Sequence, residues 1–318
     1  MPTEVQRAVS LLKNGSLVAL PTETVYGLGA DADNELAVRR IFAVKGRPSS
    51  HPLIVHVHSA EAAKSYVSAW PREAELLAAR WPGPLTLVLP RSPRASDAVT
   101  GGQETVAVRV PNHPLALEVL RELGGGIAAP SANKFGKLSP TSAEDVRADL
   151  GDEVEQILDG GRCSVGVEST IVDLSSGAPR ILRPGGMAKE EIEQVLGRAV
   201  PLATQESNVR APGMLASHYA PRAGLVLTTS DKLADDAAQR MLWGAEVAVL
   251  SPGKPVLPEG ARHFSISADP AEAARQLYAT LRSIDEAGFD VIVAVLPGEE
   301  GLGLAVRDRL ARAAAPRK

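Results

Sequence analysis

Short apolar runs typical of β-strands alternate with amphipathic helical patterns along the first 200 residues. The strand candidates are 16–20, 53–57, 85–89, 105–110, 126–130, 154–158, 169–174 and 179–183. The helix candidates are 3–14, 34–44, 71–80, 113–123, 142–149 and 188–197. Pro114 and Ser142 stand where two of these helices are expected to begin. The alternation predicts one α/β or α+β domain over residues 1–200.

A second pattern begins after Pro221. The runs "GLVLTTS", "EVAVLSP" and "VIVAVLP" are typical of buried parallel strands, with helical patterns at about 231–243, 270–287 and 301–315. They predict a smaller doubly wound domain over 222–318. It contains neither a Gly-x-Gly-x-x-Gly nor a P-loop pattern, so we assign it no nucleotide site. The stretch "PGEEGLGLAVRDRLARAA" is either a glycine-rich loop that leads into a helix or, the favoured reading, a plain turn and helix start.

Residues 201–221, "PLATQESNVRAPGMLASHYAP", show no helical or strand periodicity. Segments of this length without regular structure are linkers, disordered tethers or functional lids. Met214, Leu215 and Tyr219 can pack against a protein surface, and His218 can titrate. A disordered tether is more often rich in Gly, Ser or charge. We therefore expect a linker that acts as a lid.

The amino-acid composition limits the kinds of molecule that the protein is expected to bind. The 318 residues carry a formal net charge of −4, whereas proteins that hold nucleic acid through its phosphates are usually basic. Aromatic residues make up only 3%, which leaves few platforms for stacking bases. No apolar run is long enough to span a bilayer and no signal peptide is evident, so no membrane partner is expected. The single cysteine, Cys163, excludes an internal disulfide, and we expect a cytoplasmic protein.

The strongest cationic feature lies in "VKGRPSSHPLIVHVH", residues 44–58. Lys45 and Arg47 follow a predicted helix and suit a polyphosphate, although cations at a helix end also favour the helix dipole. His51 precedes a proline, and His56 lies in an apolar run, where it is either a ligand contact or a satisfied strand histidine. Arg109 lies within "TVAVRVPNHP", so its guanidinium is either on the solvent face or paired with a buried anion such as a substrate carboxylate.

Hydroxyl and amide side chains follow several predicted strands, where open α/β sheets place their ligands. Ser131, Asn133 and Ser139 lie in "IAAPSANKFGKLSPT", and Ser169 lies in "GVESTIVDL". Arg183 ends a strand before a Pro-Gly turn. Together these residues favour an anionic, oxygen-rich ligand such as a nucleoside triphosphate. Zinc is not expected, since no Cys/His cluster has ligand spacing, and no Gly-x-Ser-x-Gly elbow of a serine hydrolase is present.

One further loop follows the first predicted strand, in "ALPTETVYGLGADA". Thr22, Glu23 and Thr24 supply two hydroxyls and a carboxylate directly after the strand. Gly27 and Gly29 are interpreted as positions where the chain turns tightly around a ligand.

Seven motifs in order resemble the Sua5/YrdC/YciO family: "PTETVYGLGADA", "KGRP..HPLIVH", "WPGPLTLVL", "VAVRVPNHP", "APSAN...LSPT", "GVESTIVDL" and "LRPGG". The later "APGMLASHYAP" and the last domain are similar to the longer Sua5-type members. The resemblance implies a YrdC-like catalytic domain over 1–200, with a twisted, largely parallel α/β sheet and a concave cavity. It further implies a lid over 201–221 and a smaller Rossmann-like domain over 222–318.

The resemblance also implies an activity. Sua5-type members are threonylcarbamoyl-AMP synthases, nucleotidyltransferases that form threonylcarbamoyl-AMP and pyrophosphate from L-threonine, bicarbonate and ATP. A separate transferase then uses the product in the N6-threonylcarbamoyladenosine modification of tRNA. Mg²⁺ is expected with ATP, held mainly by phosphate and water, because no carboxylate cluster suggests a metal site built by the protein.

By motif, the resemblance assigns two sets of contacts. The L-threonine contacts are Thr24, His56, Arg109, the Ala129 backbone and Ser169. The ATP or adenylate contacts are Lys45, Arg47, His51, Thr105, Ser131, Asn133, Ser139, Arg183 and, in the linker, Ala216. Lys45 and Arg47 are the expected catalytic pair. His51 departs from the family's commoner asparagine.

Two alternatives stay open at this point. One is an RNA-binding YrdC-like module without catalysis, which the acidic balance disfavours. The other is a relative that keeps the cavity but uses another carbamoyl or acyl donor, which the Sua5-type linker and last domain disfavour.

Overall fold

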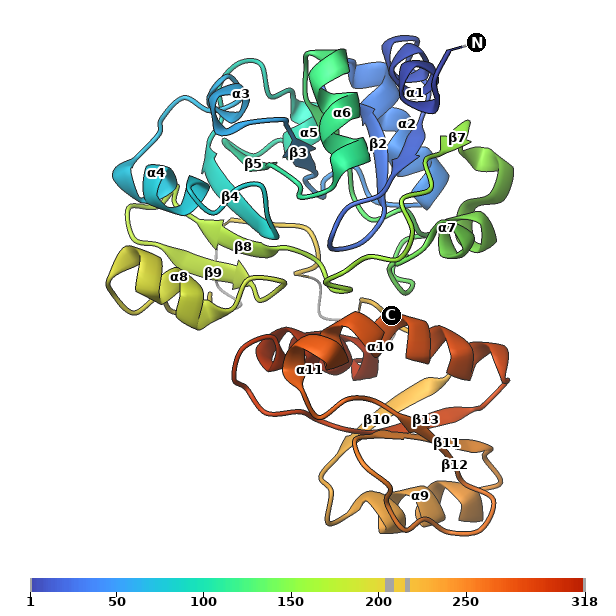
Figure 1. Ribbon diagram of the computed structural model, residues 1–318. Coiled ribbons are helices and arrows are strands. Elements are labelled where there is room, and N and C mark those ends of the chain that lie inside the picture. The colour runs from blue at the N-terminus through green and yellow to red at the C-terminus, as the bar shows by residue number, and fades with distance from the viewer. Residues whose placement is uncertain (1, 204–208, 215–217, 317–318) are drawn as a thin grey trace. The chain divides into compact units, whose positions relative to one another are not determined.

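The computed structural model describes residues 2–203, 209–214 and 218–316 (Figure 1). The predicted Ala216 contact lies outside these residues. The chain divides into two compact units. The first comprises Met1–Phe135 and Ser139–Met214, and the second comprises Gly136–Leu138 and Leu215–Lys318.

The first unit is built on a large sheet whose strand order is β7-β1-β2-β6-β3-β5-β4-β8-β9. Its strands are β1 (Val18–Leu20), β2 (Gly27–Asp31), β3 (Ile54–His56), β4 (Leu85–Pro90), β5 (Thr105–Arg109), β6 (Ile127–Ala128), β7 (Gln156–Ile157), β8 (Thr170–Asp173) and β9 (Arg180–Arg183). The pairs β1–β7, β3–β5 and β4–β8 are parallel, and the other neighbours are antiparallel. The α/β class is confirmed, with a large sheet that is mixed in detail.

Helices flank this sheet at positions close to those predicted. They are α1 (Glu4–Lys13), α2 (Glu35–Lys45), α3 (Ala60–Lys64), α4 (Arg72–Ala78), α5 (Asp97–Thr100), α6 (Pro114–Leu123), α7 (Ala143–Leu150) and α8 (Lys189–Leu196), with a 3-10 turn η1 (Gly151–Glu153). The predicted start signals are confirmed: Pro114 is the first residue of α6, and Ser142 caps α7 in a reciprocal hydrogen-bonded box with Asp145. The short helices α3 and α5 were not predicted.

The sheet buries apolar side chains on both faces because strand side chains alternate. Val18 and Leu20 of β1 pack with α1 and α6, whereas Ala19 between them belongs to the larger cluster around α2. A third cluster gathers Ile54, Val88, Ala107, Ile171 and Leu182, one residue from each of five neighbouring strands. Ala211, Val209 and Met214 of the linker pack on this cluster. Residues 209–214 of the linker therefore lie on the sheet of the first unit.

The prediction of a tight turn at Gly27 and Gly29 was wrong. Both residues lie in β2, which pairs antiparallel with β1. A Cβ on Gly29 would stand 2.8 Å from Cγ2 of Ile127 and 3.1 Å from the Val18 carbonyl oxygen. Glycine is required here for close strand packing rather than for a turn.

The second unit is a parallel sheet of order β10-β13-β11-β12, with β10 (Gly224–Thr228), β11 (Val247–Ser251), β12 (Arg262–Ser265) and β13 (Val291–Val295). Its helices are α9 (Leu233–Leu242), α10 (Pro270–Glu286) and α11 (Gly303–Ala314). Figure 1 shows α9 on one face of this sheet and α10 and α11 on the other. The three predicted parallel strands are confirmed, and β12 is an additional strand at the edge.

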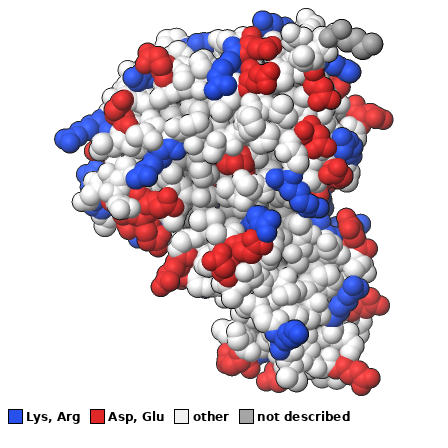
Figure 2. Space-filling model, viewed as in Figure 1, with Lys and Arg blue, Asp and Glu red and all other residues white. Residues whose placement is uncertain are grey.

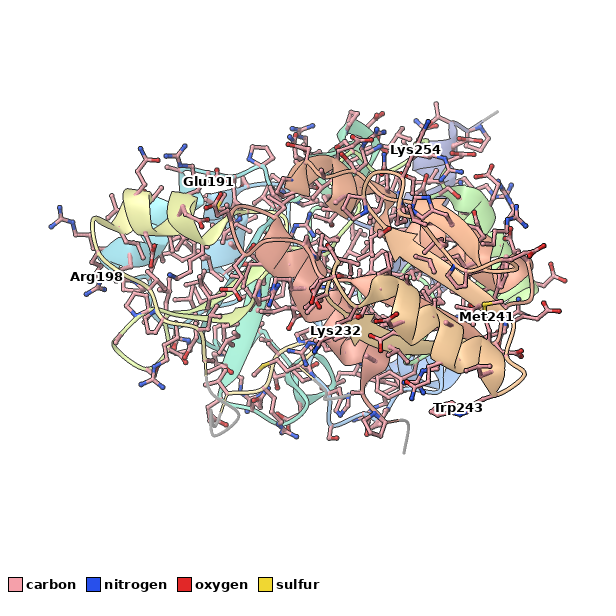
Figure 3. All side chains as sticks on the ribbon, turned by 90° about the horizontal axis from the view of Figure 1, so that it is seen from below. Glu191, Arg198, Lys232, Met241, Trp243 and Lys254 are labelled. Atoms are coloured by element: carbon pink, nitrogen blue, oxygen red, sulfur yellow. The ribbon has the colours of Figure 1, made fainter. Side chains whose placement is uncertain are left out.

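The surface of each unit is mixed in charge. Figure 2 shows basic and acidic side chains interspersed over the visible face. Figure 3 shows Lys232, Met241 and Trp243 along α9 and at its end, where Trp243 is exposed and the Arg240 guanidinium lies 4.8 Å from its ring centroid. Among the described residues, no helix combines the length and apolar character that crossing a bilayer requires.

Candidate active site

One face of the first unit's sheet collects most of the predicted threonine contacts. His56 of β3 stands opposite Arg109 of β5 in the parallel register, and the alternation of β5 places Thr105 on the same side as Arg109. Thr86 of β4 and Ser169, just before β8, join them through a 2.8 Å hydroxyl–hydroxyl hydrogen bond. The sheet thus brings side chains from four strands to one surface.

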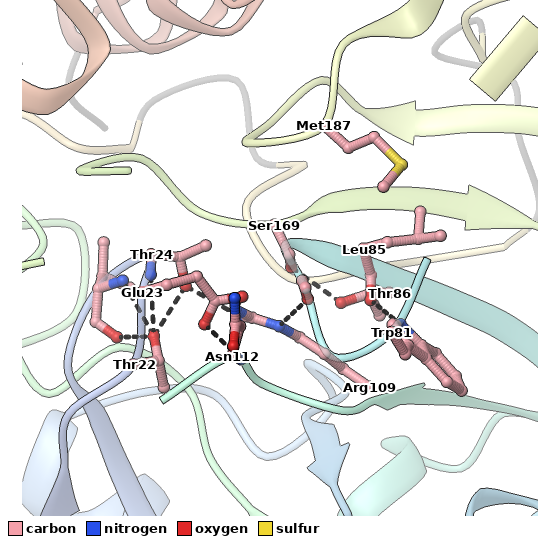
Figure 4. Close-up of polar contacts among 12 residues, drawn as sticks. Thr22, Glu23, Thr24, Trp81, Leu85, Thr86, Arg109, Asn112, Ser169 and Met187 are labelled. Atoms are coloured by element: carbon pink, nitrogen blue, oxygen red, sulfur yellow. Dashed lines mark hydrogen bonds and ion pairs between the residues drawn. The ribbon is translucent and has the colours of Figure 1, made fainter. Parts of the chain in front are cut away.

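Arg109 is the centre of this surface and is 3% exposed. Its Nη1 donates to Oγ1 of Thr24 at 3.0 Å, and its Nε donates to the Gly83 carbonyl oxygen at 3.2 Å (Figure 4). Its Nη2 lies 2.7 Å from Oε1 of Glu23 in a buried ion pair. Of the two interpretations of Arg109, the buried one is correct, and the protein itself supplies one anion.

The loop after β1 presents Glu23 and Thr24 to Arg109. Thr22 folds this loop on itself: its hydroxyl donates to the Val25 carbonyl at 2.6 Å and accepts from the backbone N–H groups of Thr24 and Val25. The second carboxylate oxygen of Glu23 accepts from the Asn112 N–H at 3.0 Å. The carboxylate is therefore fixed on two sides, next to the guanidinium.

Three buried polar atoms of this cluster lack a hydrogen bond. They are Nη2 of Arg109, Oε1 of Glu23 and Nδ1 of His56. The first two atoms form an ion pair with each other, but its geometry is not that of a hydrogen bond. Buried polar atoms are rarely left unsatisfied unless water or a ligand completes them. Burial, aided by the Arg109 charge, lowers the pKa of His56 to about 3, so its imidazole is neutral. The cluster offers a donor, an acceptor and a neutral ring to one small polar ligand.

Lys45 ends α2 and is 3% exposed. Its Nζ donates to the backbone carbonyls of Ser131 and Asn133 and so holds the loop after β6 against the end of α2. Gly46, with a φ of 63°, turns the chain at this helix end. Burial, together with the nearby Arg47 charge, lowers the pKa of Lys45 well below its usual range.

Arg47 and His51 meet the same loop at Phe135. The Arg47 guanidinium donates to the Pro52 carbonyl at 3.0 Å and lies 5.7 Å from the Phe135 ring centroid. The His51 ring is 5.5 Å from that of Phe135. Burial and the charges of Arg47 and Arg210 lower the pKa of His51. Lys45, Arg47 and His51 therefore lie around one loop.

Arg183 connects β9 with the linker. Its Nη1 donates to the Pro212 carbonyl at 2.9 Å, and its Nη2 donates to the carbonyl of Ser169 at 2.8 Å and to the Ser169 hydroxyl at 3.2 Å. Gln103 holds the same segment, since its side-chain amide donates to the Arg210 carbonyl and accepts from the Arg210 N–H. The Arg183 guanidinium and the Gln103 side-chain amide thus both hold residues 209–214 on the first unit.

The remaining predicted residues belong to the segment that follows β6, namely Ala129, Ser131, Asn133 and Ser139. The Ser139 hydroxyl donates to Oε1 of Glu168 at 2.5 Å, and the Asn133 side-chain amide donates to the Lys134 carbonyl. Ser131 forms a β-bridge with Gly27, and Ala129 donates its N–H to the Ile54 carbonyl. The structure therefore ties the loop of residues 129–139 to β2, β3 and α2.

Sequence reasoning left three residues without a role. Glu23 lies within the quoted first loop, but only the fold brings it to Arg109. Thr86 lies in a predicted strand, where only the alternation of side chains indicates which face of the sheet it occupies. Glu168 lies in the motif "GVESTIVDL" but was given no role. A buried polar residue inside an apolar strand, as at Thr86, was the available signal.

A separate cavity of about 340 Å³ opens beside α3 and is lined by residues that include His58, Tyr66 and Arg94. Arg94 is already paired with Asp33 at 2.7 Å. None of the predicted site residues lines this cavity. The predicted threonine contacts Thr24, His56 and Arg109 lie instead on the sheet face around Arg109.

The fold and these residues agree with comparisons to known proteins. A family model described as telomere recombination, Sua5_yciO_yrdC, matches residues 10–185. A second model, described as the C-terminal domain of threonylcarbamoyl-AMP synthase, matches residues 187–315. The chain therefore belongs to the Sua5/YrdC/YciO family. The second match extends the likeness to the two-domain, Sua5-type members, as the sequence motifs predicted.

Relatives align over nearly the whole chain. A threonylcarbamoyl-AMP synthase of Pyrococcus abyssi is 45% identical over 98% of this chain and 94% of its own length. A protein of the same name from Bacillus subtilis is 42% identical over 99% of this chain and 94% of its own. The crystal structure of P. abyssi Sua5 complexed with L-threonine matches with a TM-score of 0.92 at 44% identity, covering 98% of this chain and 94% of that one.

Proposed function

We propose that this protein is an L-threonylcarbamoyladenylate synthase, which converts L-threonine, bicarbonate and ATP into threonylcarbamoyl-AMP and pyrophosphate. The observation that carries the proposal is the buried Arg109 guanidinium, which directs three of its five N–H groups at Gly83, Thr24 and Glu23 and keeps two for a ligand. A small amino acid completes such a cluster. The P. abyssi relative, similar in fold over nearly the whole chain, was solved with L-threonine.

The cluster suits a zwitterionic amino acid. Arg109 binds the substrate carboxylate through its remaining N–H groups, since a guanidinium has five donors and three are directed at Gly83, Thr24 and Glu23. The hydroxyls of Thr24 and Ser169 and the Ala129 backbone are proposed as the other threonine contacts. His56, held neutral, contributes a hydrogen bond without adding a charge that would compete with the amine.

The second substrate is proposed to lie at the cationic loop. Lys45, Arg47 and Arg183 neutralise the phosphates of ATP, while Ser131, Asn133, Ser139, Thr105 and His51 supply polar contacts. A bound polyphosphate raises the depressed pKa of Lys45 towards its ordinary value, since an adjacent anion favours the charged ammonium. Ala216 keeps its proposed place next to the nucleotide by motif alone.

The reaction needs no covalent bond to the protein. The threonine amine and bicarbonate combine with loss of water to give a carbamate. A carbamate oxygen then attacks the α-phosphorus, and the bond to the bridging oxygen breaks as pyrophosphate leaves. The chain's residues position the reactants and stabilise negative charge, as is usual in phosphoryl-group chemistry.

The proposal includes Mg²⁺ as part of the ATP complex, where it supplies charge neutralisation. Among the described residues, no group of three or more His, Cys, Asp or Glu side chains could hold a metal ion. A complex of Mg²⁺ with ATP keeps a net negative charge, so the cations Lys45, Arg47 and Arg183 attract it. The same cations would repel a bare divalent metal ion.

Residues 209–214 are proposed as the fixed end of a lid. The carbamate is unstable in water, so exclusion of water protects it. The contacts of Arg183 with Pro212 and of Gln103 with Arg210 hold this segment on the site-bearing sheet.

The product is a reactive mixed anhydride and must be consumed by a transferase. We propose that a separate enzyme passes the threonylcarbamoyl group to adenosine in tRNA, in the cytoplasm. The protein itself needs no strong nucleic-acid binding for this role, consistent with its net charge of −4.

The experiment is a pyrophosphate-release assay on the purified full chain with ATP and Mg²⁺. Release that requires both L-threonine and bicarbonate supports the synthase. Release without either defines a plain nucleotidase and contradicts it. Absence of release, together with salt-dependent RNA binding, favours the RNA-binding alternative.

A further inference from the structure

The second unit contains a cavity of about 210 Å³ at the carboxyl ends of its parallel strands. Each strand contributes to its wall through a residue at or just beyond its end: Ser230 after β10, Leu250 in β11, Ser267 after β12 and Val295 in β13. Val306 and Leu310 of α11 complete the wall. The cavity therefore belongs to the sheet as a whole rather than to one loop.

Its position is the one at which open parallel sheets bind ligands. The chain leaves β10 for α9 on one face, and leaves the neighbouring β13 for α11 on the other face (Figure 1). The loops after these two adjacent strands thus diverge and leave a crevice at their carboxyl ends. Ligands in doubly wound folds occupy such a crevice.

The chemistry of the wall favours an uncharged ligand. Among the described residues that line the cavity, none is ionisable, and most are apolar. The hydroxyls of Ser230 and Ser267 and the backbone at Gly298 are its polar groups. The nearest loop carries Glu299, and Arg307 is paired with that carboxylate at 3.3 Å. A phosphate would meet no unpaired cation among these residues, so a nucleotide is disfavoured.

The size of the cavity favours a two-ring group. An apolar cavity of about 150 Å³ in another protein holds a single benzene ring. A cavity of about 210 Å³ has room for a bicyclic ring of similar thickness. Its backbone groups around Gly298 suit a ring that carries nitrogen atoms better than a pure hydrocarbon.

The loop after β13 builds one wall in a fixed conformation. A Cβ on Gly303 would stand 2.3 Å from the Gly298 carbonyl oxygen, so the two ends of this loop approach closely only because residue 303 is glycine. Arg307 donates to the Pro297 carbonyl at 2.7 Å, and the Gly303 N–H donates to the Glu300 carbonyl at 3.0 Å. The glycine-rich stretch seen in the sequence is therefore a closed loop at the mouth of the cavity.

We propose that this cavity is a binding site for an uncharged purine base or nucleoside. The base lies between Leu250 of β11 and Val306 and Leu310 of α11, and the ribose of a nucleoside points towards Ser230 and Ser267. The site is independent of the synthase reaction assigned to the first unit.

The test is hydrogen–deuterium exchange of the full chain with adenosine as the probe. Adenosine is expected to slow exchange in two segments, 266–273 and 295–306. Ala268→Phe, at an exposed position on the cavity wall, is expected to abolish this protection because the larger side chain obstructs the cavity. Ala287→Phe, at the C-cap of α10 and away from the cavity, is the matched control and is expected to retain it. Because the readout is located in these segments, binding in the first unit cannot be mistaken for it.

Several outcomes would overturn the proposal. One is unchanged exchange in both segments at millimolar adenosine; another is protection that survives Ala268→Phe. Equal protection by AMP would contradict the uncharged class, and equal protection by indole would contradict the purine class. Loss of pyrophosphate release has no bearing on these results, so the two proposals fail separately.

Discussion

Nη2 of Arg109 lies 2.7 Å from Oε1 of Glu23, and both side chains are at most 5% exposed. The guanidinium that is proposed to bind the substrate carboxylate is thus already balanced by a carboxylate of the protein. Removal of one partner from a buried ion pair leaves the other charge uncompensated.

Glu23→Gln is therefore expected to lower the free energy of unfolding of the first unit by roughly 3–5 kcal/mol. Urea unfolding measures this change. Glu35→Gln removes an exposed pair with Arg39, at 3.6 Å, and is the control, with an expected loss below about 1 kcal/mol. Equal effects of the two substitutions would show that the buried pair contributes nothing special.

Arg109→Lys keeps the positive charge near Glu23 but loses the planar fork that can hold a second carboxylate. One charge-assisted hydrogen bond contributes roughly 1.5–3 kcal/mol, so KM for L-threonine is expected to rise roughly 10- to 150-fold. KM for ATP stays near the wild-type value. Steady-state pyrophosphate release at varied threonine and at varied ATP measures both, and Arg39→Lys, at an exposed position of α2, is the control. An unchanged threonine dependence in folded Arg109→Lys would refute the carboxylate assignment.

The depressed pKa of His56 predicts a pH dependence of stability. The folded protein keeps His56 neutral down to about pH 3, whereas the unfolded chain takes up a proton near pH 6.5. Unfolding therefore binds a proton below pH 6.5, and stability is lost as pH falls from 6.5 towards 3, by up to about 1.4 kcal/mol per pH unit. Urea unfolding of wild type and His56→Gln at several pH values tests this. The substitution should flatten the slope, and parallel slopes would contradict the prediction.

Gly29→Ala places a Cβ 2.8 Å from Ile127 and 3.1 Å from the Val18 carbonyl. Overpacking of this kind costs about 1–3 kcal/mol, and the melting temperature should fall accordingly. At Gly125 a Cβ would meet its nearest atom at an ordinary 3.4 Å, so Gly125→Ala is the matched control. If both variants melt together, β2 tolerates the extra methyl and the close-packing account of Gly29 is wrong.

Gln103→Ala removes both hydrogen bonds to the Arg210 backbone. Hydrogen exchange in residues 209–214 is expected to quicken, and synthesis to slow, because the lid is less well fixed. Gln156→Ala, which removes a bond to the Glu4 carbonyl, is the control and leaves both unchanged. Faster exchange in residues 209–214 with full activity would show that this segment does not contribute to catalysis.

Periodicity located most of the secondary structure, and its failures have physical causes. The second strand, Gly27–Asp31, was missed because glycine suppresses the strand signal, although the same glycines permit close packing. The edge strand Arg262–Ser265 was missed because its side chains are exposed or half-buried and include Arg262 and His263, so it lacks an apolar run. Helices as short as Ala60–Lys64 contain too few turns to show a period.

The sequence was enough to name the residues of the candidate site, but their contacts could be known only from the fold. Motifs and strand ends pointed to Arg109, His56 and Lys45. The pairing of Arg109 with Glu23 depends on strands that are distant in the chain and meet only in the folded sheet. The role of Lys45 in holding the Ser131 loop through carbonyls likewise needed the fold.

The proposed reaction joins bicarbonate and threonine in a carbamate and joins that carbamate to the AMP part of ATP. The most direct measurement is mass spectrometry of the product formed by the full chain from ATP, Mg²⁺, L-threonine and ¹³C-bicarbonate. The expected product is threonylcarbamoyl-AMP that carries the heavy carbon, with pyrophosphate in equal amount. AMP and pyrophosphate without labelled adenylate, in a wild-type protein that binds threonine, would contradict it.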